Sequence, residues 1–300
     1  MFRTFSEVED YIANMHTTKT IALCGAHENI ALEAVVRAKR KGFINAILLG
    51  DEEKIIDLLA HMEEDPAEYQ IIHAPRGKSA AMKAVQSVRD GRADILMKGL
   101  LQSAEFLTPI MMPSTGLFSE GSQLNEATVF YYPERNGFVF AGDCALNIAP
   151  SVEEKIRIIN NLVDFARAFG AKEVKVAAVS ALEKVNSEMP STGVANQLAQ
   201  MEWEEGIIVE GPFALDNALD AAAAEHKGIE SRVAGKADIL LMPEILSGNV
   251  LHKCVHFLAH LPSASVLCGA DVPVVFNSRT DSSDMKYFSI LSAILQSLKK

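Results

Sequence analysis

The sequence predicts an α/β protein made of two α/β/α domains, with mixed, mostly parallel sheets and a cleft between the domains. Short apolar runs rich in β-branched residues alternate with longer segments whose apolar residues lie three and four positions apart. One pair of strand-like runs is joined only by a turn, which adds an antiparallel hairpin to the parallel order. The 300 residues are enough for two ordinary domains with sizeable cores.

The predicted strands are short apolar runs bounded by turn residues. Strands separated by helices form parallel sheets covered on both faces, which explains why these runs are almost wholly apolar. In chain order they are TIALCGA (20–26), NAILLG (45–50), YQIIHAP (69–75), ADILMKG (93–99), VKVAAVS (174–180), GIIVEGP (206–212), ADILLMP (237–243) and VPVVFNS (272–278). The hairpin is predicted over ATVFYYPERNGFVFAGD (127–143), where Asn136-Gly137 is the turn signal.

The predicted helices fill the intervals between these strands, and several end in glycine, a common helix terminator. They cover residues 31–42, 51–62, 79–91, 151–170 and 197–206. A final helix is expected after Ser282 or Ser283, either of which can cap its first turn. Its apolar residues form two stripes along the helix.

No low-complexity linker divides the chain, so the domain boundaries are placed where a strand motif meets a new helix or strand. The best candidates are near Pro150 and near Gly269. They predict a discontinuous first domain (1–149 plus 270–300) and a second domain (150–269). A chain that leaves a domain and returns to it builds a cleft between two lobes, which is a usual place for a ligand.

Composition excludes several classes of function. The formal net charge is −11, which argues against a nucleic-acid surface because phosphate backbones require clustered Lys and Arg. The sequence contains no run of eighteen apolar residues, so no membrane span is predicted. The N-terminal segment lacks the features of a signal peptide. The four cysteines are widely spaced in apolar runs, which favours reduced thiols in a cytoplasmic protein.

Sequence motifs for metal or nucleotide chemistry are absent. No GxGxxG, GxxxxGK[ST], GxSxG or HExxH pattern occurs, and no aspartate pairs are clustered for a divalent ion. His252, His256 and His260 share one helical face, but no carboxylate joins them, so a helical surface is the favoured interpretation. The prediction is therefore that no metal and no permanent cofactor is bound.

Candidate site residues are expected after the predicted strands, because ligands bind at the carboxyl ends of strands in open α/β sheets. The candidates are Lys98, Gly99, Ser103, Asp143, Asn147, Gly248, Asn249, Lys253, Ser278, Arg279, Asp281 and Asp284. The stretch VPVVFNSRTDSSDMKYF (272–288) has two interpretations: a helix cap with a salt-bridged arginine, or an anion site made of helix N–H groups, a hydroxyl and a guanidinium. Lys98 either reaches solvent or, with Gly99, meets a ligand.

Six motifs occur in order over nearly the whole chain. They are ADILMKG with Ser103 (93–103), AGDCALNIAPSVEEK (141–155), VSALEKVNSEMPSTG (179–193), EGPFALDNA (210–218), VAGKADILLMPEILSGNVLHK (233–253) and FNSRTDS (276–282). Taken in this order, they resemble the phosphate acetyl/butyryltransferase family. The MKG and SRTDS versions are more similar to phosphate butyryltransferases than to phosphate acetyltransferases.

This resemblance implies a reversible reaction of a short-chain acyl-CoA, butyryl or branched C4–C5, with inorganic phosphate to give acyl phosphate and CoA. It also implies a fold related to isocitrate/isopropylmalate dehydrogenases and a homodimer or higher homo-oligomer. Arg279 would hold the phosphate, and Ser278 would donate to charge developing at a reacting oxygen. Lys98 and Lys253 would add positive charge, Gly248-Asn249 would approach CoA or acyl phosphate, and Ser103, Asp143 and Asn147 would help to bind substrate.

Two departures from the family pattern leave alternatives open. Met285 stands where relatives have an aspartate that takes the CoA thiol proton, so Asp281 and Asp284 are the candidates for the general base. LNEA (124–127) stands where many relatives have a Ser-His pair. The alternatives are a phosphate acetyltransferase, a non-catalytic acyl-CoA-binding member of the family, and a metal-dependent hydroxyacid dehydrogenase, for which the expected motifs are missing.

Overall fold

The computed structural model describes residues 1–298, and its chain forms two compact units. The central unit contains Met1–Thr4 and Gln123–Ser263, and the flanking unit contains Phe5–Ser122 and the chain from Ala264 onward. The predicted boundaries near 150 and 269 differ from this division, because the hairpin before Pro150 pairs with a strand of the central unit. Lys299 and Lys300, the end of the predicted first domain, lie outside the described residues.

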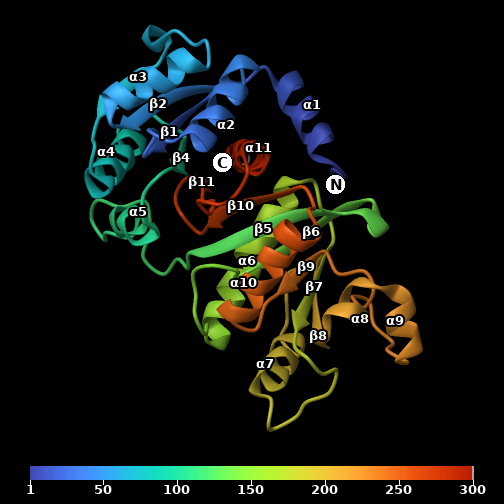
Figure 1. Ribbon diagram of the computed structural model, residues 1–300. Helices are drawn as coiled ribbons and strands as arrows, with labels where there is room; N and C mark the ends of the chain where they lie inside the picture. The colour runs from blue at the N-terminus through green and yellow to red at the C-terminus, as the bar shows by residue number, and fades with distance from the viewer. Residues whose placement is uncertain (299–300) are drawn as a thin grey trace. The chain divides into compact units, whose positions relative to one another are not determined.

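The flanking unit is built on a mostly parallel sheet with the strand order β3-β2-β1-β4-β11-β10 (Figure 1). Only β10 runs antiparallel, against β11. The reversal of strand order lies between β1 and β4, and such a switch point is where open α/β sheets bind ligands. The strands are β1 (Lys19–Cys24), β2 (Ile44–Gly50), β3 (Gln70–His73), β4 (Ile95–Lys98), β10 (Ser263–Cys268) and β11 (Val274–Val275).

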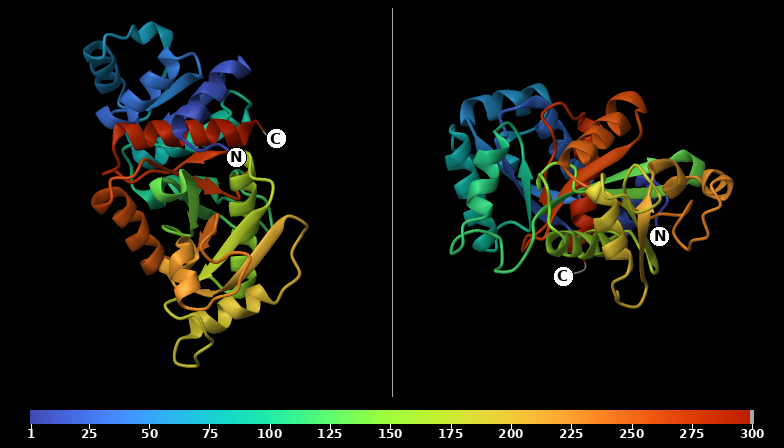
Figure 2. Two further views of the ribbon diagram at one scale, coloured as in Figure 1. Left: turned by 90° about the vertical axis from the view of Figure 1, so that its right-hand side faces the viewer. Right: turned by 90° about the horizontal axis from the view of Figure 1, so that it is seen from below.

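Helices of the flanking unit begin at recognisable caps. Glu28 caps α2 and Ser282 caps α11, in each case by accepting hydrogen bonds from N–H groups of the first turn. α11 lies against α2 (Figure 2). The Phe288 ring of α11 stacks on the Phe5 ring of α1, with 4.3 Å between the centroids. The helices are α1 (Phe5–Met15), α2 (Asn29–Arg40), α3 (Glu52–His61), the 3₁₀ turn η1 (Pro66–Glu68), α4 (Gly77–Arg89), α5 (Ser103–Ile110) and α11 (Ser283–Ser297).

The central unit has the strand order β5-β6-β9-β7-β8, in which β5 and β6 form the predicted antiparallel hairpin. The neighbouring pairs β6/β9, β9/β7 and β7/β8 are parallel. The strands are β5 (Asn125–Tyr132), β6 (Gly137–Gly142), β7 (Val174–Val179), β8 (Ile207–Phe213) and β9 (Ile239–Leu241). The helices are the 3₁₀ turn η2 (Pro133–Arg135), α6 (Val152–Ala168), α7 (Pro190–Ala199), α8 (Leu215–Leu219), α9 (Ala221–His226), α10 (Ile245–Lys253) and the π-helical turn η3 (Cys254–Leu258).

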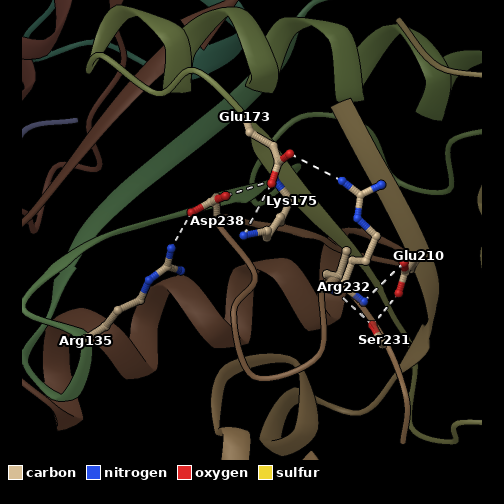
Figure 3. Close-up of polar contacts among 8 residues, drawn as sticks. Arg135, Glu173, Lys175, Glu210, Ser231, Arg232 and Asp238 are labelled. Atoms are coloured by element: carbon tan, nitrogen blue, oxygen red, sulfur yellow. Dashed lines mark hydrogen bonds and ion pairs between the residues drawn. The ribbon is translucent and has the colours of Figure 1, made fainter. Parts of the chain in front are cut away.

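A polar network ties the amino-terminal ends of β7 and β9 to the hairpin (Figure 3). Asp238, which precedes β9, pairs with Arg135 of η2, and it also accepts the Lys175 backbone N–H at 2.9 Å. Glu173 pairs with Lys175 and Arg232 at 3.6 and 3.3 Å. These bonds join β7, the residue before β9 and the η2 turn of the hairpin. They lie at the amino-terminal ends of the strands, opposite the carboxyl ends where ligands are expected, and they fix strand register.

The predicted fold class, α/β with mixed and mostly parallel sheets, is confirmed. Some elements differ from prediction, among them the short helices α5, α8 and α9, which were not predicted. SASVLC (263–268) forms β10, a strand that its small residues did not indicate. The helix predicted over 197–206 instead spans Pro190–Ala199, with Pro190 in its first turn, where proline is favoured, and the chain turns at Gly206 with φ of 85°.

Candidate functional site

Strand pairing in the flanking unit brings Lys98 beside the Ser278–Arg279 turn. β4 and β11 are parallel, with Met97 opposite Val275, so their carboxyl ends lie at the same edge. Lys98 is the last residue of β4, and its ammonium group lies 5.9 Å from the centre of the Phe276 ring. Two of the predicted site segments, distant in sequence, therefore meet beside the switch point of this sheet.

The turn after β11 is held by buried polar groups. Asp281 is fully buried, and its Oδ2 accepts the Ser278 backbone N–H at 2.8 Å and the Asn277 side-chain N–H at 3.3 Å. On the other side, the Lys286 ammonium group donates to the Ser278 carbonyl at 2.8 Å. Asp281 and Lys286 thus fix the backbone that carries Ser278 and Arg279.

The groups carried by this turn face outward. Ser278 is half-buried, with its hydroxyl 3.1 Å from that of Thr280, and Arg279 is exposed. Within residues 1–298, Arg279 makes no ion pair. The helix cap in the first interpretation is present, at Ser282, but the salt-bridged arginine is not. The guanidinium is available to an anion from solution.

Lys98 is buried in a positive environment. Only 3% of its surface is exposed, and in the part of the chain that the structure describes it makes no hydrogen bond or ion pair. Burial, helped by the charges of Lys286 and Arg279, lowers the pKa of Lys98 to about 8, against smaller opposing effects of Asp281 and Cys24. The interpretation in which Lys98 reaches solvent is wrong.

Asp284, one of the two predicted general bases, lies in the first turn of α11 and contacts α2. It forms an ion pair with Arg37 of α2 at 2.6 Å, and its side chain is 69% exposed. The Arg37 guanidinium also stacks on the Tyr287 ring at 3.8 Å. Met285, at the position of the family aspartate, is buried. Asp284 therefore acts first as a partner of Arg37.

Gly99 and Ser103 follow Lys98 in the chain. A Cβ at Gly99 would lie 2.5 Å from the Gly25 carbonyl oxygen, because the loops after β1 and β4 touch there. Glycine is thus required by backbone packing, whatever a ligand also needs. Ser103 is exposed in the first turn of α5, where its N-cap Gln102 and Glu105 form a capping box.

In the central unit, Asp143 and Asn147 are engaged with one another and with their own loop. The buried Asp143 carboxylate accepts N–H groups of Ala145, Leu146 and Asn147 at 2.8–2.9 Å. Burial raises the pKa of Asp143, although these hydrogen bonds oppose the shift. The Asn147 amide donates to Asp143 at 2.5 Å and to the Leu124 carbonyl at 2.8 Å. Both side chains shape the loop.

The remaining candidates lie on α10, which packs on this loop. A Cβ at Gly248 would lie 2.3 Å from the Asp143 carbonyl oxygen, so glycine permits the close approach of α10. Asn249 is exposed, and its amide donates to the Cys144 carbonyl at 3.3 Å. The Lys253 ammonium group lies 5.6 Å from the centre of the Phe257 ring. The structure therefore brings these three residues and Asp143 into one region of the central unit.

The sequence did not reveal an apolar pocket at the carboxyl ends of β7 and β9. Its volume is about 240 Å³, below the usual range for drug-sized ligands, so it suits a small apolar group. The lining comes from Val179, Val194, Ala195, Leu198, Leu241, Met242 and Pro243, among others. Beside it, the buried Lys155 donates to the Pro243 carbonyl at 2.6 Å. The only sequence signal is that two of these residues end strands.

No group of three or more His, Cys, Asp or Glu side chains within residues 1–298 is placed to hold a metal ion. In the same residues, no helix is both long and apolar enough to cross a membrane.

Comparison with known proteins gives consistent matches over the whole chain. Residues 76–294 match the family described as "Phosphate acetyl/butaryl transferase". The chain is 39% identical to the phosphate butyryltransferase of Clostridium acetobutylicum over 298 residues, covering 98% of each chain. It is 38% identical to the phosphate acetyltransferase of Thermotoga maritima, covering 92% of this chain and 95% of that one. A branched-chain phosphotransacylase from Enterococcus faecalis V583 has a similar structure, with a TM-score of 0.83 and 28% identity, over 93% of this chain and 99% of that one.

Proposed function

Since the chain belongs to the phosphate acetyl/butyryltransferase family, we propose that Lys98 and the Ser278–Arg279 turn bind inorganic phosphate in its active site. The protein is a phosphate acyltransferase, which converts an acyl-CoA and phosphate into acyl phosphate and CoA. Acyl-CoA and phosphate are its substrates, and no permanently bound cofactor is part of the proposal.

The observation that carries this proposal is positive charge without a bound counter-ion. The whole chain has a net charge of −11, yet Arg279 and Lys98 stand near one another at strand ends, and within residues 1–298 neither forms an ion pair. A guanidinium binds a phosphate group through two parallel charge-assisted hydrogen bonds. A phosphate dianion is thus the ligand that this arrangement favours.

The chemistry follows from orientation and charge. A phosphate held by Arg279 presents an oxygen to the thioester carbonyl of the acyl-CoA, and holding the reactants in line supplies much of the catalysis. The Ser278 hydroxyl donates to the negative charge that develops on the carbonyl oxygen. Asp281 and Lys286 keep the Ser278 backbone in place, so the turn is organised before the substrate arrives.

The remaining assignments are also part of the proposal. Asn249 and Lys253 of the central unit, with the loop that Asp143 and Asn147 shape, bind the CoA part of the substrate, and the polar Ser103 contacts the phosphate side. The preferred acyl group has four or five carbons, because the MKG and SRTDS motifs are of the butyryl type. We place the protein in the cytoplasm as a homodimer or higher homo-oligomer; its four cysteines are free thiols.

The test is thiol release from acetyl-, butyryl- and isobutyryl-CoA, with and without phosphate, by metal-free protein. Phosphate-dependent release with the four-carbon esters preferred supports the proposal, and preference for acetyl-CoA would replace it by a phosphate acetyltransferase. Substitution of the proposed phosphate ligand, Arg279→Gln, has Arg92→Gln as its control. Arg92 pairs with Asp90 in the turn before β4, at the opposite end of that strand from the site. Binding of CoA without any thiol release would indicate a non-catalytic member of the family.

A further inference from the structure

The reaction needs a group that moves a proton to and from the CoA sulfur. When the carbon–sulfur bond of the thioester breaks, sulfur carries the electron pair, and the thiolate must gain a proton to leave as CoA. In the reverse reaction the thiol must lose that proton before it attacks. The question is which side chain at the ends of β4 and β11 has the geometry for this transfer.

The two carboxylates of this region are committed elsewhere. Asp281 is fully buried beneath the turn and accepts the N–H groups of Ser278 and Asn277. Protonating it would remove an acceptor from the backbone that carries the phosphate-binding groups. Asp284 is paired with Arg37 on α2. Each carboxylate is therefore held by hydrogen bonds or an ion pair that a change of protonation would disturb.

Two other groups of the region are also unsuitable. Lys286 donates to the Ser278 carbonyl, so it supports the turn. Burial raises the pKa of the Cys24 thiol far above neutrality, although Lys98 opposes this shift, so Cys24 stays protonated.

Lys98 has the required position. It ends β4, next to Met97, which pairs with Val275 of β11, and in the described chain it is held by no hydrogen bond or ion pair. We propose that Lys98 is the general acid–base group that exchanges a proton with the CoA sulfur. This inference rests on the proposed phosphate acyltransfer and adds to it the residue that carries the proton.

The step balances without any further reactant. An oxygen of HPO₄²⁻ forms a bond to the carbonyl carbon, the carbon–sulfur bond breaks, and sulfur takes a proton from the Lys98 ammonium group. The proton of the phosphate passes to the resulting amine and restores the ammonium form. The sum is acyl-CoA plus HPO₄²⁻ giving acyl phosphate dianion plus CoA thiol, and the reverse reaction follows the same path.

The surroundings of Lys98 suit this role. Burial and the positive charges of Lys286 and Arg279 bring its pKa to about 8, while Asp281 and Cys24 act in the opposite direction. An ordinary cysteine thiol has a pKa of about 8.5, so the amine and a thiol exchange a proton with little difference in free energy. Arg279, which stays charged, continues to hold the phosphate while Lys98 changes its state.

The experiment compares kcat/KM against pH for wild type and Lys98→Arg in both directions. Arginine keeps the positive charge but does not give up its proton. We expect Lys98→Arg to lose about 10²–10⁴-fold in kcat/KM, the range for general acid–base groups, while the KM for phosphate stays within about threefold. The matched control is Lys39→Arg, at a lysine of α2 that pairs with Glu68 at 2.9 Å and has no part in the proposed site, and it should keep the wild-type pH profile.

The wild-type profiles should differ in direction. Formation of acyl phosphate needs the ammonium form, so its kcat/KM falls as pH rises through about 8, whereas formation of acyl-CoA needs the amine form and rises over the same range. In Lys98→Arg, kcat/KM should show neither the fall in one direction nor the rise in the other over this pH range. Lys98→Ala, if it folds with wild-type circular dichroism, should recover activity with added methylamine or ethylamine and not with guanidine.

Three outcomes would overturn the inference, and the third is distinguishable from the first two. If wild type releases thiol with phosphate and Lys98→Arg keeps at least a third of kcat/KM with the same pH limbs, Lys98 does not move the proton, and the transferase assignment stands. Failure of amines to rescue a folded Lys98→Ala has the same meaning. A wild-type protein without phosphate-dependent thiol release would overturn the proposed function together with this role.

Discussion

Substitution of Gly99 by alanine tests whether the contact between the loops after β1 and β4 holds the flanking unit together. The added Cβ would lie 2.5 Å from the Gly25 carbonyl oxygen and 2.9 Å from that of Cys24. Since Cβ atoms do not approach other atoms within 3.0 Å, the loops must separate by about 0.5 Å.

The magnitude follows from what this separation disturbs. Overpacking of a tight site costs about 1–3 kcal/mol. The hydrogen bonds from the Gly99 N–H to Cys24 O (2.7 Å) and from the Leu100 N–H to Gly25 O (3.0 Å) would weaken, each being worth about 1 kcal/mol. We therefore expect a loss of about 2–4 kcal/mol in the free energy of unfolding, or roughly 4–16 °C in Tm for a unit of this size.

Differential scanning calorimetry measures this loss, and Gly193→Ala is the matched control. Gly193 lies inside α7, and a Cβ there would meet no atom within 4 Å. Alanine is favoured over glycine in a helix interior by about 0.5–1 kcal/mol, so this variant should be more stable than wild type. If Gly99→Ala unfolds within about 0.5 kcal/mol of wild type and loses only activity, the packing argument is refuted, and Gly99 serves the ligand alone.

Three further predictions concern charged residues. Arg279→Gln should lower kcat/KM for phosphate by about 10- to 100-fold with an unchanged Tm, because an exposed group binding a dianion is removed; wild-type saturation with phosphate would contradict this. Asp284→Asn should change kcat by less than about threefold, since its exposed ion pair is worth at most about 1 kcal/mol; a hundredfold loss in a steady-state assay would restore it as a base. Burial opposes the shift, but bonds from the Tyr69 hydroxyl and Arg40 lower the pKa of Glu64 overall. The stabilisation is therefore present above the ordinary glutamate value of about 4.3 and is lost as pH falls through the lowered pKa. Tm measured from pH 6 to 3 should fall less steeply for Glu64→Gln than for wild type, and parallel curves would show that Glu64 contributes nothing.

The sequence was sufficient for those features that depend on local pattern and on the parallel order of strands. Ser282, one of the two serines expected at the start of α11, caps it, and the hairpin turns at Asn136-Gly137 with Asn136 at φ of 46°. Lys98 and Arg279 were both identified because each follows a buried strand, and parallel strands end at one edge. Chemistry at strand ends can thus be found without knowing the three-dimensional path between them.

Features that depend on packing between distant segments were not predictable. β10 contains two buried serines, so its sequence carries little strand signal. Its antiparallel pairing with two residues of β11 is seen only in the structure. Asp143 reads as a ligand-binding carboxylate from its place after β6, yet its oxygen atoms accept N–H groups of its own loop. The commitment of Asp281 to the turn and of Asp284 to Arg37 likewise appears only when the helices are packed.

The discontinuous flanking unit has a consequence for synthesis on the ribosome. Its sheet contains β1 to β4 from one part of the chain and β11 from another, and β11 is made only after the whole stretch 123–263. At ordinary translation rates this interval is on the order of ten seconds, long enough for the central unit to fold first. During that time the edge of β4, which will pair with β11, has no partner strand, and such an edge favours aggregation. Chaperone demand should therefore fall on the nascent flanking unit, and the Ser278–Arg279 turn appears only when that exposure ends.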